Sequence, residues 1–467
     1  MIFSSISFLY YFLAACLLVY FIVPSRLKNL VLLLFSLAFY FYGEPVYTLL
    51  MLASTLSAYL HGLAIDRSRG TKWARFFLWS SVATSIALLG FFKYSDFFIS
   101  NLNSLFAADI PLLRLALPIG ISFYTFQTLS YTVDVYRGEA KVQKSFIRLA
   151  TYVTLFPQLI AGPIVRYTTV ETELSGRKHS FESFAAGVNR FVIGLAKKVL
   201  IADTLGLLVK DFATSGDRSV VFYWVYAVAV SLQLYFDFSG YSDMAIGLGR
   251  LFGFHFLENF NYPFISKSIA EFWRRWHMSL GQWFRDYVYI PLGGNRVSTG
   301  RWIRNVLVVW LLTGFWHGAD WTFVFWGLYF ALFLLLERFF LSKWLDKLPR
   351  FVSHGYVAVV ILVSFVLFNA NGLTGAAADI GAMFGLGTLP LWSADTAYYL
   401  SSYAGVLIAA LIGCTPLVKT AAQKLYQCKW SGRAMDVLEP LFHVCLLVLV
   451  TAYLVDGSFS AFLYFRF

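Results

Sequence analysis

The chain has 467 residues, of which 59% are hydrophobic and 13% are charged. A soluble domain carries about 25% charged residues, so this composition excludes an ordinary soluble protein and predicts a polytopic membrane protein. The formal net charge of +12 does not indicate a nucleic-acid partner, because the basic residues gather in the loops between apolar runs and do not cover one surface.

Long apolar runs recur along the whole chain. Most of them approach the roughly 20 residues that a helix needs to cross a bilayer. The runs are 8–23, 46–63, 76–92, 115–133, 220–236, 356–368, 403–411 with its flanks, and 441–455. We therefore expect an all-α polytopic membrane protein with roughly ten to twelve membrane-embedded helices, including re-entrant or interfacial ones.

The loops between these runs differ in charge. Basic residues cluster at 26–28, 67–75 and 137–148, whereas the loops around 43–45 and 101–109 carry almost none. Because basic loops face the cytoplasm, this alternation predicts a multi-pass protein whose N-terminus is extracytoplasmic. The first run has no basic residues before it, which favours an uncleaved span over a signal peptide.

Two carboxylates stand in an apolar part of the chain. Asp237 and Asp243 belong to the segment YFDFSGYSD at 235–243, and carboxylates inside a membrane usually line a cavity or pair with a base. The glycines that follow miss the dinucleotide-binding fingerprint by one residue. Gly249 and Gly253 favour close packing between membrane helices instead.

The stretch 258–305 is rich in tryptophan and arginine and too polar to span a membrane. Apolar residues recur at helical spacing over 269–287, which predicts one amphipathic helix that ends at the turn 291–295. A helix of this kind lies in the membrane interface, with tryptophans at headgroup depth and arginines toward water. His277 does not fit that description, because it shares a face with Trp273 and not with the charged residues.

A second histidine lies in the longest apolar run, within 301–338. That run exceeds the roughly 20 residues of one spanning helix, so we expect breaks at 313–314 and at Gly318. The second break would place His317 at bilayer depth, where an ionisable group is costly and usually functional.

A neutral imidazole at this depth is a ready proton acceptor at cytoplasmic pH. It can take the proton of a hydroxyl group as that group attacks an activated acyl carbon. Asp320 either orients the His317 ring or faces water. The alternative is a structural histidine, hydrogen-bonded to a backbone carbonyl in a helix break. We expect no metal, because His277 and His317 lie far apart in the chain and neither has a His or Cys partner at ligand spacing.

Several long segments carry a resemblance to a known family. They are YFDFSGYSDMAIGLG at 235–249, ENFNYPFISKSIAEFWRRWHMSLGQWFRDYVYIPLGGNR at 258–296 and GFWHGADWTFVFWG at 314–327, with LPIGISFYTFQTLSYTVDVYRG at 117–138, FPQLIAGPIVR at 156–166 and KKVLIADTL at 197–205. These motifs are similar to those of the membrane-bound O-acyltransferase family, specifically its bacterial branch that acts in alginate O-acetylation. The similarity spans nearly the whole chain.

The resemblance implies a single membrane domain over 1–467, with helices around a central funnel. Its parts would be N-terminal spans (1–257), a cytoplasmic or interfacial region (258–305), a catalytic-histidine segment (306–340) and C-terminal spans (341–467).

The activity that the resemblance implies is that of an O-acetyltransferase in a bacterial inner membrane. Such a protein moves an acetyl group from cytoplasmic acetyl-CoA across the membrane to an extracytoplasmic polysaccharide, such as an alginate-like exopolysaccharide, peptidoglycan or cellulose. An extracytoplasmic acetyltransferase partner protein would complete the transfer. Acetyl-CoA would be a substrate, no cofactor would be tightly bound, and membrane lipid would be a further partner.

The resemblance also assigns site residues. The family's catalytic histidine matches His317, and its second signature histidine matches His277. The candidate substrate-binding residues are Trp273, Arg274, Arg275, Trp276, Arg285, Asp237, Asp243, Trp316 and Asp320. The arginines would bind CoA phosphates or contact anionic lipid, and the tryptophans would stack on adenine or anchor the interface.

Two other classes of protein stay open. Broken helices and ionisable groups at the midplane also characterise secondary transporters, although the sequence has no second copy of the histidine-bearing break. A non-catalytic subunit of a polysaccharide-secretion complex would tolerate the loss of His317.

Overall fold

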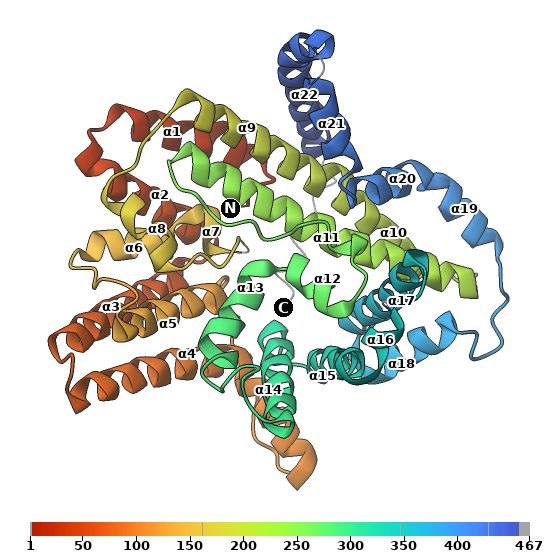
Figure 1. Ribbon diagram of the computed structural model, residues 1–467, viewed down its shortest axis with the longest axis horizontal. Coiled ribbons are helices and arrows are strands. Elements are labelled where there is room, and N and C mark those ends of the chain that lie inside the picture. Colours follow the sequence, from red (N-terminus) through yellow and green to blue (C-terminus); the bar gives the residue numbers. More distant parts are fainter. Residues whose placement is uncertain (1, 161, 346, 428, 457–467) are drawn as a thin grey trace. The chain divides into compact units, whose positions relative to one another are not determined.

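The computed structural model describes residues 2–160, 162–345, 347–427 and 429–456 (Figure 1). Every regular element within these ranges is a helix, which confirms the predicted all-α fold. The helices form two compact units, one of Met1–Phe191 with Ser242–Leu257 and the other of Val192–Tyr241 with Glu258–Phe467. The predicted single domain and its four parts stay a prediction.

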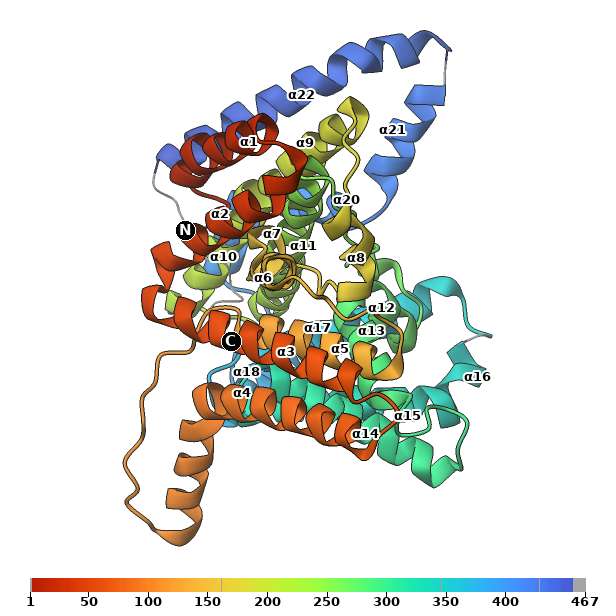
Figure 2. The ribbon, with the colours of Figure 1, turned by 90° about the vertical axis from the view of Figure 1, so that its left-hand side faces the viewer.

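The first unit contains the N-terminal helices. They are η1 (Ser7–Phe12), α1 (Leu13–Ile22), η2 (Ser25–Leu27), α2 (Lys28–Gly43), α3 (Pro45–Arg67), α4 (Lys72–Phe106), α5 (Ile121–Arg137), α6 (Phe146–Thr154), α7 (Phe156–Leu159), α8 (Tyr167–Ser175) and the start of α9 (Phe181–Ala196). Helices α3, α4 and α5 lie side by side (Figure 2). A Cβ atom at Gly62 of α3 would lie 2.8 Å from the Tyr131 hydroxyl of α5, so glycine permits their close approach.

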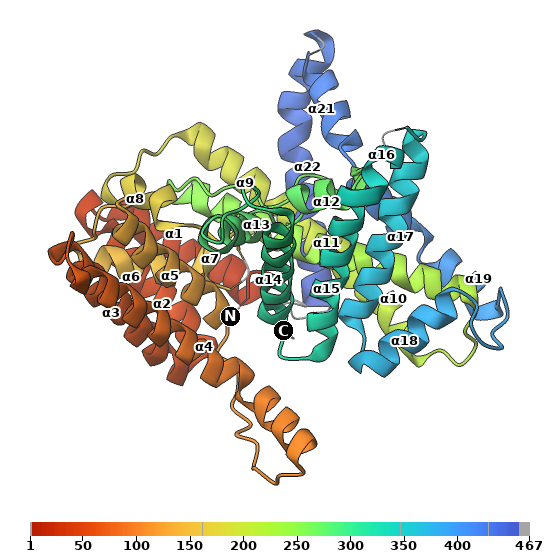
Figure 3. The same ribbon diagram turned by 60° about the horizontal axis from the view of Figure 1, so that its bottom comes forward.

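The second unit contains the remaining helices. They are η3 (Lys197–Ala202), α10 (Asp203–Thr214), α11 (Val220–Leu251), η4 (Pro263–Ile265), α12 (Ile269–Arg275), α13 (Met278–Phe284), η5 (Arg285–Tyr289), α14 (Thr299–His317), α15 (Trp321–Leu336), η6 (Glu337–Leu341), α16 (Ser342–Leu345), α17 (Arg350–Asn369), α18 (Gly372–Met383), α19 (Ala394–Ser402), α20 (Ala404–Gly413), α21 (Leu417–Gln427) and α22 (Lys429–Val455). Helix α15 packs between α14 and α17 (Figure 3).

The last turns of α11 belong to the first unit, together with most of α9. A Cβ atom at Gly247 of α11 would lie 2.6 Å from the Gly187 carbonyl oxygen of α9, so glycine lets the two backbones touch. The predicted pair, Gly249 and Gly253, does not make this contact. Gly253 follows the end of α11 in the left-handed region, with φ of +78°.

Six helical segments of the described chain are long and apolar enough to cross a membrane. They are α3, α4, α11, Trp321–Leu345 of α15 to α16, α17, and Ala434–Val455 of α22. Helices α19 and α20, bent by 61° at their junction, make a seventh span if they are counted together. The protein is therefore a multi-pass membrane protein. The expected number of ten to twelve embedded helices includes shorter segments and stays a prediction.

The predicted break at 313–314 is wrong, because α14 continues to His317. Gly314 serves close packing: a Cβ atom there would lie 2.2 Å from the Phe323 carbonyl oxygen of α15. One glycine inside a helix costs only about 1 kcal/mol, so it does not by itself end a helix. The predicted break at Gly318 is confirmed.

Candidate active site

The first histidine lies at a break between two short helices. Helix α12 begins after Ser268, whose hydroxyl accepts a hydrogen bond from the Glu271 N–H (3.0 Å). The chain is extended at Trp276, and His277 then adopts the left-handed region with φ of 45° and ψ of 51°. The single helix predicted over 269–287 is therefore wrong, because the helical spacing of its apolar residues continues across a backbone break.

Asn259 holds this unusual backbone in place. Its backbone carbonyl accepts from the Met278 N–H (3.0 Å), and its side-chain oxygen accepts from the Ser279 N–H (3.1 Å) and the Ser279 hydroxyl (2.9 Å). The sequence patterns missed Asn259, since its side-chain partners lie 18 and 20 residues further along the chain.

The same oxygen also fixes the tautomer of His277. Nδ1 of His277 lies 3.3 Å from the Asn259 side-chain oxygen. The Ser279 N–H donates to the same atom, which identifies it as the amide oxygen. Because an amide oxygen can only accept a hydrogen bond, Nδ1 donates to it and carries the proton. Nε2 is then a hydrogen-bond acceptor. It is buried and has no hydrogen-bond partner among the described residues.

Aromatic rings surround the His277 side chain. Its ring centroid lies 4.6 Å from that of Phe238 and 6.1 Å from that of Trp316, and the residue is only 2% exposed. Burial lowers the pKa of His277 to about 3. The ring is therefore neutral at physiological pH, and Nε2 offers a lone pair to an N–H or O–H group that a ligand brings.

His317 is the last residue of α14 and is buried. The chain turns at once into α15 because Gly318 is extended, and a Cβ atom there would lie 2.2 Å from the Phe323 ring. Only glycine fits at this turn. The sequence therefore fixes His317 at a helix end, where its ring faces the interior of the second unit.

The His317 ring lies in an aromatic cluster. Its centroid is 5.0 Å from Trp316, 5.1 Å from Trp326 and 5.3 Å from Phe368. Because Trp316 also contacts His277, one tryptophan ring joins the two histidines. The structure thus brings together the two predicted catalytic residues and one predicted substrate-binding residue.

The Asp320 carboxylate is exposed and caps α15. It accepts from the Thr322 N–H and from the Thr322 hydroxyl, both at 2.8 Å. These bonds satisfy a free donor at the helix start. The sequence left two alternatives for Asp320, which either orients the His317 ring or faces water. This arrangement fits the second alternative.

Trp273 and Trp276 point into the second unit. Trp276 packs against Phe272 and Phe365 at centroid distances of 5.5 and 5.1 Å, and Trp273 packs against Trp310 at 4.7 Å. Both belong to the aromatic core around Trp326. The two rings therefore pack inside the protein, and their predicted position at headgroup depth stays a prediction.

The three predicted arginines are spread around the break. Arg275 pairs with Glu271 (2.9 Å), Arg285 pairs with Asp286 (2.7 Å), and Arg274 is exposed. Burial favours a raised pKa for Glu271, but the Lys267 N–H and the Arg275 guanidinium outweigh it and hold that pKa below its usual value. Two of the three cations thus already have a carboxylate partner.

The carboxylates of α11 both pair with a base, as one predicted alternative states. In the second unit, the Lys198 ammonium lies 2.8 Å from Asp237 and 2.6 Å from Asp203. In the first unit, the Arg190 guanidinium lies 2.6 Å from Asp243. These ion pairs hold α11 against its neighbours.

No group of three or more His, Cys, Asp and Glu side chains is placed to hold a metal ion in the part of the chain that the structure describes. The two buried imidazoles are suited to acid–base chemistry. His317 can exchange a proton with a substrate, and His277 can orient a substrate by accepting a hydrogen bond.

Comparisons with known proteins agree with this chemistry. A model of the MBOAT, membrane-bound O-acyltransferase family matches residues 6–373. The chain is 40% identical over 417 residues to a probable alginate O-acetylase AlgI of Azotobacter vinelandii, with 88% of this chain and 84% of the relative covered. It is 32% identical over 519 residues to a peptidoglycan O-acetyltransferase of Helicobacter pylori, with 100% and 98% covered.

A more distant relative transfers a different group. The chain is 31% identical over 266 residues to a teichoic acid D-alanyltransferase of Bacillus subtilis, with 54% of this chain and 67% of the relative covered. The matched residues 6–373 include both histidine-bearing segments. The chain therefore belongs to the membrane-bound O-acyltransferase family and is a multi-pass O-acyltransferase.

Proposed function

We propose that the chain transfers an acetyl group from acetyl-CoA at the cytoplasmic face to a hydroxyl group of an extracytoplasmic polysaccharide. One observation carries the proposal: His277 and His317 come from separate elements, are both buried, and contact the same Trp316 ring. Relatives named for alginate and peptidoglycan O-acetylation support the class of acceptor.

In the proposed reaction, a sugar hydroxyl oxygen attacks the thioester carbonyl carbon while His317 accepts the hydroxyl proton. The tetrahedral intermediate then collapses, the C–S bond breaks, and the CoA thiolate takes the proton from the His317 imidazolium. The products are an acetyl ester and free CoA, and His317 is again neutral. A thioester has a higher transfer potential than an oxygen ester, so the step needs no other source of energy.

His277 has a separate role in this proposal. Its neutral Nε2 accepts a hydrogen bond from an N–H or O–H group of the donor or the acceptor and so holds that molecule against His317. Correct orientation of two reactants removes a large part of the entropic barrier. Loss of His277 would therefore weaken positioning, whereas loss of His317 would remove the proton acceptor.

The proposal includes an orientation. The N-terminus is extracytoplasmic and the basic loops at 26–28, 67–75 and 137–148 face the cytoplasm of a bacterial inner membrane, which the excess of basic residues in these loops supports. Donor and acceptor then approach from opposite sides of the membrane. An extracytoplasmic acetyltransferase partner protein presents the polymer to the site.

Purified protein in lipid nanodiscs tests the proposal. Acetyl-CoA labelled in its acetyl group is supplied with an oligosaccharide acceptor, and both CoA release and acceptor labelling are measured. His317→Ala is expected to lower transfer by at least about 100-fold, the contribution typical of a general base. The control His255→Ala changes an exposed histidine that pairs with Glu173 and is expected to keep the wild-type rate.

Two outcomes would contradict the proposal. A wild-type rate in the His317→Ala variant would exclude His317 as the base. Binding of the ligand without any cleavage of the thioester would point to a transporter.

A further inference from the structure

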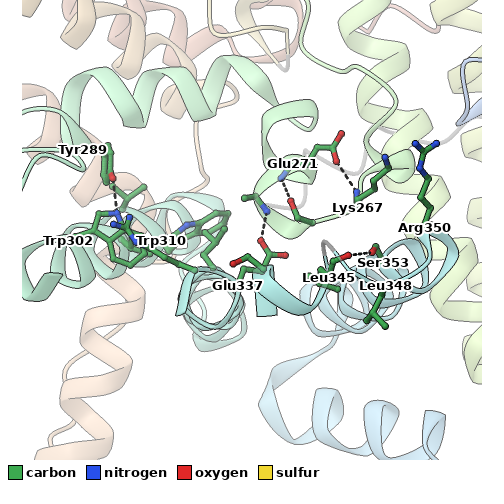
Figure 4. Close-up of a pocket in the computed structure, with 17 residues that line it drawn as sticks. Lys267, Glu271, Tyr289, Trp302, Trp310, Glu337, Leu345, Leu348, Arg350 and Ser353 are labelled. Carbon is green, nitrogen blue, oxygen red and sulfur yellow. Dashed lines mark hydrogen bonds between the residues drawn. The ribbon is translucent and has the colours of Figure 1, made fainter. Parts of the chain in front are cut away.

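A cavity of about 790 Å³ lies within the second unit, apart from the two histidines (Figure 4). Its walls come from the start of α12, the first half of α14, the end of α15 with η6 and α16, and the start of α17. Its lining residues include none of His277, Trp316 and His317. The proposed transfer reaction gives this cavity no role.

Three cations line the cavity. Lys267, Arg338 and Arg350 are exposed, and no carboxylate among the described residues forms an ion pair with any of them. The two carboxylates of the wall have other partners. Glu271 pairs with Arg275, and Glu337 accepts hydrogen bonds from the first N–H groups of α12. The cavity therefore presents a net positive charge.

The two ends of the cavity differ in character. Lys267 and Arg350 lie toward one end, and Tyr289, Trp302 and Trp310 toward the other (Figure 4). The Trp302 indole N–H donates to the Tyr289 hydroxyl (3.0 Å), which fixes the orientation of the ring. The Arg338 guanidinium lies over the Trp302 ring at this second end, 3.8 Å from the ring centroid. The cavity is thus amphipathic, with Lys267 and Arg350 at one end and aromatic side chains at the other.

Aromatic rings separate this cavity from the catalytic histidine. Trp310 at its edge packs on Trp273 (4.7 Å), Trp273 packs on Trp326 (5.6 Å), and Trp326 packs on His317 (5.1 Å). A molecule seated in the cavity does not touch the His317 ring. The lining of the cavity is therefore distinct from the aromatic cluster around His317.

We propose that this cavity binds a phosphate-bearing amphiphile. The phosphate lies between Lys267 and Arg350, which make charge-assisted hydrogen bonds to its oxygens. The apolar part lies against Trp310 and the neighbouring Val306 and Leu334. A volume of about 790 Å³ suits a ligand of that size, since sites for small molecules span about 300–1,000 Å³. Two molecules share this chemistry, an anionic phospholipid of the surrounding bilayer and the CoA part of the donor.

Binding to purified protein tests this inference without any acetyl transfer. In one arm, binding of free CoA is measured by titration calorimetry in phosphatidylcholine nanodiscs. In the other arm, retention of phosphatidylglycerol is measured by native mass spectrometry. The double variant Lys267→Gln, Arg350→Gln is compared with wild type and with Arg301→Gln, Lys419→Gln, which removes two exposed cations of the same unit that do not line the cavity.

The double variant is expected to lose roughly tenfold or more of the affinity in one arm, because each hydrogen bond to a charged group is worth about 1.5–3 kcal/mol. The control pair keeps wild-type binding. Loss of CoA binding identifies CoA as the ligand, and loss of phosphatidylglycerol retention identifies the phospholipid. Equal behaviour of all three proteins in both arms overturns the inference.

A further variant separates this inference from the proposed function. His317→Ala is expected to lower transfer by at least about 100-fold and to leave CoA binding and lipid retention at the wild-type level. Failure of the proposed function therefore leaves the binding result intact, and failure of the binding result leaves the role of His317 intact.

Discussion

At the scale of single residues, His277 depends on a backbone conformation that costs a non-glycine residue about 1–3 kcal/mol. Asn259 offsets this cost through its hydrogen bonds to Met278 and Ser279. The same side chain keeps the proton of His277 on Nδ1. Asn259 therefore determines both the position of the His277 ring and the ability of its Nε2 atom to accept a hydrogen bond.

Asn259→Asp tests this dependence. A carboxylate still accepts from Nδ1 but stabilises the imidazolium, so it raises the pKa of His277. The pKa of His277, followed by NMR of its ring, is expected to rise by at least about one unit. Ser279→Ala is the control, since it removes a donor to Asn259 without adding a charge. An unchanged pKa of His277 in the Asp variant would mean that Asn259 does not tune His277.

His277 also makes stability depend on pH. Burial lowers its pKa to about 3 in the folded protein, whereas the unfolded value is about 6.5. The unfolded chain thus binds more protons between these values, and the folded state loses up to about 1.4 kcal/mol per unit as pH falls through this range. Thermal unfolding in detergent is expected to show a smaller drop in Tm from pH 7 to pH 5 for His277→Gln than for wild type. Parallel curves would contradict burial of a neutral ring.

At the scale of elements, the α14–α15 hairpin determines how deeply the His317 ring is buried in the protein. Gly314 and Gly327 allow the two helices to touch, since a Cβ atom at Gly327 would lie 2.3 Å from the Trp310 carbonyl oxygen. Gly318 then makes the turn. The aromatic contacts of His317 with Trp326 follow from this close approach.

Gly314→Ala is expected to force the hairpin apart and to destabilise the protein by about 1–3 kcal/mol, the usual cost of overpacking. Gly300→Ala is the matched control in the same helix, because a Cβ atom there meets no other atom within 4 Å. The control should keep or slightly raise the Tm, since alanine is the better helix former. Equal melting temperatures for the two variants would mean that the hairpin tolerates the added atom.

The elements also show what the sequence can and cannot predict. Burial of His317 and the break at Gly318 follow from a run too long for one span. The break at His277 was not predictable from periodicity, because apolar spacing continues through it and Asn259 stabilises it from a distance along the chain. The break expected at 313–314 is absent because Gly314 serves helix packing. The sequence around such a glycine does not distinguish it from a glycine that ends a helix.

At the scale of the whole molecule, the all-helical fold and the six candidate spans follow from composition and apolar runs. The family follows from long motifs in both units. The cationic cavity does not, because Lys267, Arg338 and Arg350 stand in three segments that only the tertiary fold brings together. Each of these residues alone resembles an ordinary basic residue at a membrane surface.

The most direct test of the central claim is the O-acetyl content of envelope polysaccharides from cells that carry wild-type protein, His317→Ala or no copy of the gene. Mass spectrometry measures acetyl esters per sugar, and immunoblots confirm equal amounts of protein in the membrane. The account predicts that His317→Ala matches the deletion strain. Wild-type acetylation in cells with the His317→Ala protein would contradict it.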